Sequence, residues 1–165
     1  MFKSIQLLTL FLGTLSFSCI SCDKDIDLGY QPDVIDSLIS STGLLVEVTG
    51  FENLDGDIAI AIYNSSETFN SETTYYRDSA VTVSANSITI HFDYMDPGTY
   101  AISVLHDTDQ SGDMGMGGLF NLIPQEGFGF SNNPEIGFSE PKFDVCKFEL
   151  EEGLIVFVPI SLIYM

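Results

Sequence analysis

Residues 97–133, PGTYAISVLHDTDQSGDMGMGGLFNLIPQEGFGFSNN, decide the fold of this chain. They predict a β-strand that runs into an Asp-rich loop and then into a long connection rich in Gly and Phe. Tyr100 stands two residues after Gly98 at the start of this strand, which matches the tyrosine corner that latches connections in β-sandwiches through its hydroxyl group. The stretch therefore favours an all-β domain with candidate ligand residues at the end of one strand.

Alternating apolar and polar residues extend this prediction on both sides of the stretch. Seven strands are expected, at residues 43–51, 57–64, 80–85, 87–94, 98–107, 142–150 and 154–164. Asp55-Gly56 predicts a hairpin between the first two strands. The last strand is apolar on both faces, which is typical of a central strand, and Pro159 predicts a bulge or a strand end within it. We expect an antiparallel β-sandwich, immunoglobulin- or prealbumin-like, with a long loop between the fifth and sixth strands.

The N-terminus indicates export. Lys3 precedes an apolar run at residues 5–15, which is shorter than the roughly 20 residues that cross a bilayer. Cys22 follows Ile20 and Ser21 and resembles the lipidated cysteine of a bacterial lipobox. Cys19 has the bulkier Phe17 at the equivalent position, so we favour Cys22 as the lipid anchor. Neither cysteine has a leucine three residues upstream, which leaves cleavage by an ordinary signal peptidase as an alternative.

These signals divide the chain into a lipoprotein-type signal at residues 1–22, a tether at 23–42 and a β-sandwich domain at 43–165. We expect a lipoprotein of the bacterial outer membrane, facing the periplasm or the cell surface. Its contact with the membrane would be the lipid anchor.

The acidic composition restricts the partners of the protein. Without residues 1–21, four Lys and Arg against 24 Asp and Glu give a formal charge of −20. This charge repels nucleic acid and anionic lipid surfaces, whereas a protein or carbohydrate partner stays possible. The apolar content of 45%, with 13 Phe and 7 Tyr, excludes a disordered acidic tail. Cys146 is expected to be a small buried strand residue rather than a nucleophile.

The Asp-rich loop is the candidate metal site. Asp107, Asp109 and Ser111 offer oxygen ligands at loop positions one, three and five, Gly112 permits a tight turn, and the carbonyl of Asp113 adds an oxygen. Calcium suits such a set, and magnesium suits it less because it keeps several waters. Position twelve is Gly118 instead of the glutamate of an EF-hand. The alternative is a solvated loop held by Asx-type turns, and the sequence leaves open whether Glu126 folds back as a further ligand.

No catalytic residue is predicted. The G-x-S-x-G, H-E-x-x-H and Cys–His patterns are absent from the sequence, and His91 and His106 are expected to be structural. The competing hypotheses are a hydrolase with a site near His106, Asp107 and Glu126, and an accessory subunit that adds an edge strand to a partner. Phe128 and Phe130 are expected to pack into the core. The alternative is that they form an exposed surface that stacks on sugars or peptides.

The order of these motifs resembles the bacterial family catalogued as domain of unknown function 2141. The resemblance rests on PGTYAISVLHD, the D-x-D-x-S-G loop, IPQEGFGFSNN, Pro141-x-Phe143 and an apolar strand ending in Tyr164, and it covers residues 43–165. It implies an exported β-sandwich, often a lipoprotein, and no particular activity. Family members typically place another Asp where this chain has Gly115, which weakens the case for calcium.

Overall fold

The computed structural model describes residues 41–71, 73–118, 123–137 and 139–165, all in the second of the chain's two units, Pro32–Met165. The predicted signal and nearly all of the predicted tether lie outside the described residues. Within those ranges, no helix has both the length and the apolar character needed to span a bilayer.

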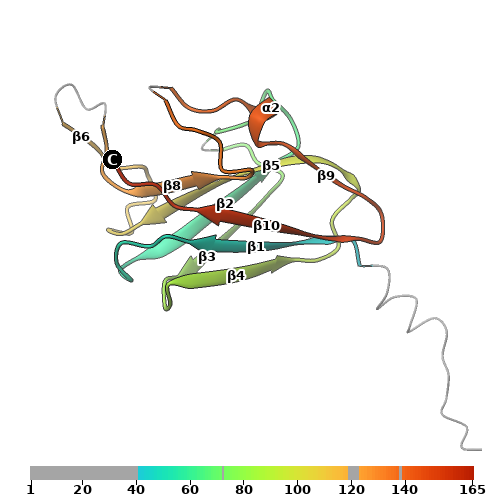
Figure 1. Ribbon diagram of the computed structural model, residues 1–165, viewed down its shortest axis with the longest axis horizontal. Helices are drawn as coiled ribbons and strands as arrows, with labels where there is room; N and C mark the ends of the chain where they lie inside the picture. Colours follow the sequence, from blue (N-terminus) through green and yellow to red (C-terminus); the bar gives the residue numbers. More distant parts are fainter. Residues whose placement is uncertain (1–40, 72, 119–122, 138) are drawn as a thin grey trace, which may run out of the picture. The chain divides into compact units, whose positions relative to one another are not determined.

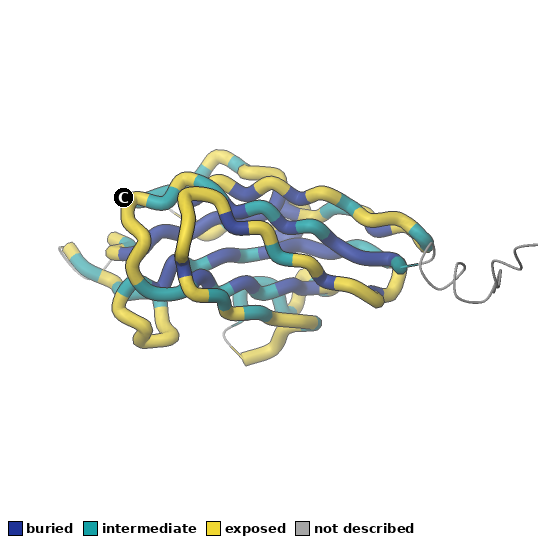
Figure 2. The backbone as a smooth tube through the Cα atoms, turned by 90° about the horizontal axis from the view of Figure 1, so that it is seen from below, coloured by how far each residue is buried: buried dark blue, intermediate teal, exposed yellow. Residues whose placement is uncertain are grey.

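The regular elements of the described residues are β-strands except for one short helix, which confirms the all-β prediction (Figure 1). In chain order the elements are β1 Gly43–Thr49, β2 Asp57–Tyr63, β3 Arg77–Thr82, β4 Ser87–Phe92, β5 Gly98–Asp107, β6 Met116–Gly117, β7 Ile123–Pro124, β8 Gly127–Phe130, the short helix α2 Phe143–Cys146, β9 Phe148–Leu150 and β10 Ile155–Ser161. Figure 2 shows buried and more exposed positions alternating along the strands. This is the pattern of strands that bury one face.

Two larger sheets share one hydrophobic core. One sheet has the strand order β10-β1-β4, and the other has the order β3-β2-β5-β8, with β9 also paired to β5. Both are open sheets with outer strands rather than a closed barrel. Alternate side chains of β1 and β2 meet in the same core, and its fully buried members include Val46, Val48, Ile58 and Ile62. The tyrosine corner is confirmed, because the hydroxyl of Tyr100 donates a hydrogen bond to the carbonyl of Asp96 at 2.8 Å.

The prediction of a hairpin at Asp55-Gly56 was wrong. β1 and β2 belong to different sheets, so the turn carries the chain from one sheet to the other. A hairpin would place the two strands side by side, whereas here both point apolar side chains into the shared core. The prediction of wholly antiparallel pairing also fails at one place, because β1 pairs with β10 in parallel.

β10 is an outer strand, not the central strand that its apolar sequence predicted. Its register with β1 is continuous through Pro159, so the predicted bulge or strand end at this residue was also wrong. Proline is tolerated because its missing N–H would face away from β1. On that outer side, the side-chain amide of Asn133 donates to the carbonyl of Pro159 at 2.9 Å and accepts from the N–H of Ser161 at 2.8 Å.

The long predicted loop contains a strand of the larger sheet. β8 pairs with β5 in antiparallel register, with Phe128 opposite Leu105. Phe128 and Phe130 are buried, which confirms that they pack inward. They join a second cluster with Tyr63, Ala101, Phe143 and Cys146.

Residues 143–146 form the helix α2, where a strand was predicted. The helix places Phe143 and Cys146 in the second cluster, on the sheet face opposite the main core. Cys146 is buried as expected, and burial raises the pKa of its thiol to about 11. It is therefore a thiol, not a thiolate, at neutral pH.

Candidate metal-binding site

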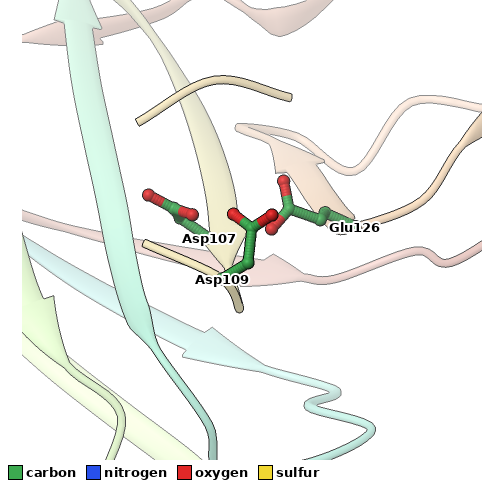
Figure 3. A group of neighbouring side chains, drawn as sticks. All are labelled: Asp107, Asp109 and Glu126. Carbon is green, nitrogen blue, oxygen red and sulfur yellow. The ribbon is translucent and has the colours of Figure 1, made fainter. Parts of the chain in front are cut away.

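Three carboxylates from two distant parts of the chain meet at the end of β5. Asp107 is the last residue of β5, Asp109 follows two residues later, and Glu126 directly precedes β8. One oxygen from each lies within 4.8 Å of the other two (Figure 3). The pairing of the strands explains this arrangement, because His106 lies opposite Gly127 and the next residues along, Asp107 and Glu126, become neighbours.

Backbone N–H groups hold the first two carboxylates in place. Asp107 is buried, and its two oxygens accept hydrogen bonds from the N–H groups of Ser111 at 2.9 Å and Gly112 at 2.8 Å. Asp109 is exposed and accepts a second bond from the N–H of Ser111 at 3.0 Å. Hydrogen bonds from Ser111 lower the pKa of Asp109. The Asp109 carboxylate is therefore ionised at neutral pH.

The carboxylate of Glu126 forms hydrogen bonds with both ends of the acidic loop. Only 4% of its surface is exposed. One carboxylate oxygen accepts from the N–H of Thr108 at 2.8 Å and from its hydroxyl at 3.2 Å, and the other accepts from the N–H of Gly115 at 3.0 Å. A carboxylate has about four lone-pair positions, so these bonds leave room for a cation.

The turn between β1 and β2 packs against the end of β5, beside the three carboxylates. Gly56 has a φ of +71° and lies so close to β5 that a Cβ atom would stand 2.0 Å from the carbonyl oxygen of Asp107. The next residue, Asp57, lies opposite Asp107 in the β2–β5 pair and accepts a hydrogen bond from the side chain of Gln110 at 3.0 Å. Acidic residues directly opposite each other repel, and a bound cation would reduce that repulsion.

The structure groups the carboxylates of Asp107 and Asp109, two of the predicted ligand residues, with that of Glu126. Ser111 lies beside them, because its N–H donates to both aspartates. The hydroxyl of Ser111 donates to the carbonyl of Asp113 at 3.1 Å, and the Asp113 carboxylate is not part of the three-carboxylate group. The sequence holds no local signal for Glu126, since its place depends on the pairing of β5 with β8.

His106 lies on the other face of β5 and does not face the carboxylates. Its side chain is fully buried and packs beside Phe51. Its Nε2–H donates a hydrogen bond to the carbonyl of Asp55 at 2.8 Å, and its Nδ1 lies 2.7 Å from the hydroxyl of Tyr164. The hydrolase hypothesis needs His106 beside a carboxylate. These contacts argue against it.

The fold and the site define an all-β protein with a carboxylate group at the end of a central strand. The chain belongs to the family described as uncharacterized protein conserved in bacteria (DUF2141), whose model matches residues 46–155. This confirms the family that the sequence motifs indicated. Neither the curated proteins nor the solved structures give a match.

Proposed function

We propose that this protein is an exported, lipid-anchored β-sandwich that acts as a binding or structural module of the bacterial cell envelope and is stabilised by calcium. The observation that carries the metal proposal is the convergence of Glu126 with Asp107 and Asp109, whose oxygens lie within 4.8 Å of one another. Two of these three carboxylates are buried. Buried charges need opposite charges or hydrogen bonds to offset their lost hydration.

Calcium fits this donor set better than magnesium. It takes about six to eight oxygens in a flexible arrangement, including carboxylates, hydroxyls and backbone carbonyls. Asp107, Asp109 and Glu126 supply carboxylates, and Ser111 and the carbonyl of Asp113 are further oxygen donors in the same loop. A divalent cation would also offset part of the negative charge of the chain.

A sandwich of the immunoglobulin or prealbumin type is the arrangement that the sheets support best. Both larger sheets contribute side chains to one core. The hydrogen bond between Tyr100 and Asp96 is typical of sandwich connections.

Thermal unfolding with and without calcium tests the metal site. If the dissociation constant is about 10 µM, 1 mM calcium stabilises the folded state by about 2.7 kcal/mol, or roughly 10 °C for a domain of this size. Asp109→Asn should abolish this shift. Asp113→Asn is the matched control, because it removes the same charge from the same loop but keeps its carbonyl. The absence of a shift at millimolar calcium, or an equal loss in both variants, would refute the site.

Membrane fractionation tests the anchor. Cys22→Ala should move the protein from the membrane fraction to the soluble fraction, and Cys19→Ala should leave it in the membrane fraction. The anchor at Cys22 is refuted if its replacement leaves the partitioning unchanged.

A further inference from the structure

The outer edge of β10 carries backbone groups that no other described strand pairs with. The N–H of Gly43 donates to the carbonyl of Leu154, so the even-numbered residues of this strand direct their backbone groups toward β1. The odd-numbered residues direct theirs outward. On that side, the side chain of Asn133 donates a hydrogen bond to the carbonyl of Pro159 and accepts one from the N–H of Ser161. In the described part of the chain, we find no hydrogen bond to the outward groups of Ile155 or Phe157.

An apolar groove runs beside this open edge. It has a volume of about 280 Å³ and is lined by Asn132, Asn133, Phe148, Val156, Phe157, Val158 and Pro159. Ile155 and Phe157 expose 59% and 53% of their surfaces, and Leu154 exposes 49%. Neighbouring exposed side chains of this size are typical of interaction surfaces.

The chain itself bounds the open edge at the C-terminal end of β10. Beyond β10, Ile163 forms a reciprocal pair of backbone hydrogen bonds with Phe128, which joins this end of the chain to β8. The available stretch is therefore short and is bounded by Pro159 and the side chain of Asn133. An open edge that short, with proline beside it, resists indiscriminate strand addition.

The charge around the edge is negative. Residues 148–165 contain Glu149, Glu151 and Glu152 and no Lys or Arg. All three glutamates are exposed. The nearby Lys147 is paired with Asp144 at 2.8 Å.

We propose that the outer edge of β10 binds an extended segment of a partner protein. This segment carries apolar side chains at alternate positions and is basic at one end. The segment would add a strand to the β10-β1-β4 sheet by bonding to the backbone of Ile155 and Phe157. Its apolar side chains would fill the groove, and its basic end would lie beside Glu151 and Glu152. Main-chain pairing of this kind supplies affinity, and the side-chain pockets supply specificity.

A second copy of this chain is a poorer occupant than a basic segment, because each copy carries a large negative charge. The proposal is also independent of calcium. Tyr100, near the start of β5, lies opposite Phe148 of the groove, whereas Asp107 ends the same ten-residue strand. Binding at the edge should therefore be unchanged by EDTA.

Peptide binding to the processed protein tests the proposal. The probes are the fluorescent peptides KKTVTVT and TVTVTKK, which cover both strand directions, and EETVTVT and TVTVTEE as charge controls. Fluorescence polarisation should show saturable binding of at least one lysine peptide that weakens with salt, and roughly tenfold weaker binding of its glutamate counterpart. No binding of either lysine peptide, or equal binding of lysine and glutamate peptides, overturns the proposal.

A pair of variants separates main-chain pairing from apolar contact. Phe157→Ala and Phe157→Pro both remove the ring, but only proline removes the outward N–H. Pro159 shows that this edge accepts proline. The proline variant should bind roughly tenfold more weakly than the alanine variant, and equal binding overturns strand addition. If Phe157→Pro does not fold, N-methylation of alternate peptide residues makes the same test on the unaltered protein.

Hydrogen exchange and sedimentation distinguish the other occupants. The amides of Ile155 and Phe157 should exchange fast in the free protein and slowly with the lysine peptide. Slow exchange in the free monomer would show that the chain's own N-terminal segment covers the edge. Concentration-dependent dimers protected at these amides would show that a second copy does. Either result overturns the proposal.

Discussion

Replacement of Gly56 by alanine tests how closely the turn between β1 and β2 packs on the end of β5 that carries the candidate metal site. The new Cβ would lie 2.0 Å from the carbonyl oxygen of Asp107 and 2.6 Å from the Cα of Thr108. Both are backbone atoms, so neither can rotate away as a side chain would. The turn or the end of β5 must therefore move by about 1.4 Å to restore an ordinary contact of 3.4 Å.

The cost has two parts. A φ of +71° costs a non-glycine residue about 1–2 kcal/mol, and overpacking against backbone costs about 1–3 kcal/mol more. For a domain of about 120 residues, the entropy of unfolding is about 0.25 kcal/mol per degree. We therefore expect Gly56→Ala to lower the melting temperature by roughly 8–20 °C.

Circular dichroism melts with a matched control measure this effect. Gly153 has a φ of +74° and no atom within 4 Å of an added Cβ. Gly153→Ala therefore introduces the backbone strain of a positive φ without a steric clash. It should lower the melting temperature by only about 4–8 °C and leave the proposed stabilisation by calcium unchanged. Equal losses in the two variants would contradict the close packing of Gly56 on Asp107.

Three further predictions concern buried polar groups. Tyr100→Phe removes the hydrogen bond to Asp96 and should lower the free energy of unfolding, measured in urea, by about 1 kcal/mol; an unchanged midpoint would count against the tyrosine corner. Tyr164→Phe leaves Nδ1 of His106 without its 2.7 Å partner and should lower the free energy of unfolding by about 1–3 kcal/mol in the same assay. An unchanged free energy of unfolding would indicate that another group replaces the hydroxyl. Cys146 should react with a thiol reagent at pH 8 only as fast as the protein unfolds, because burial raises its pKa to about 11; rapid reaction of the native protein would contradict that burial. Since the unfolded thiol ionises near pH 8.5, its contribution to stability is complete below that pH and is lost as the pH rises toward about 11.

The alternation of side chains was sufficient to locate most of the strands. It placed β1, β2, β4 and β5 nearly at their observed bounds, because burial of one face imposes a period of two on any strand. The same pattern says nothing about which strands are neighbours. This is why Asp55-Gly56 predicted a hairpin although the turn crosses between sheets, and why the outer position of β10 was missed.

Short elements were missed for a different reason. β8 has the sequence Gly-Phe-Gly-Phe, whose glycines are typical of loops. They are required here because a Cβ at Gly129 would lie 2.7 Å from Ile160 and one at Gly127 would lie 2.4 Å from Tyr164. Residues 143–146 became helical although their sequence suited a strand, and in this form they bury Phe143 and Cys146 in the second cluster.

The sequence by itself determined the class of fold, the family and the acidic loop with Asp107 and Asp109, because each of these is written in neighbouring residues. Only the tertiary structure decided that Glu126 completes the carboxylate group, that His106 turns away from it and that β10 lies at the outer edge of its sheet among the described strands. These features depend on which strands pair and on which face each residue occupies. Pairing is decided by contacts between segments far apart in the chain, and local sequence patterns do not encode such contacts.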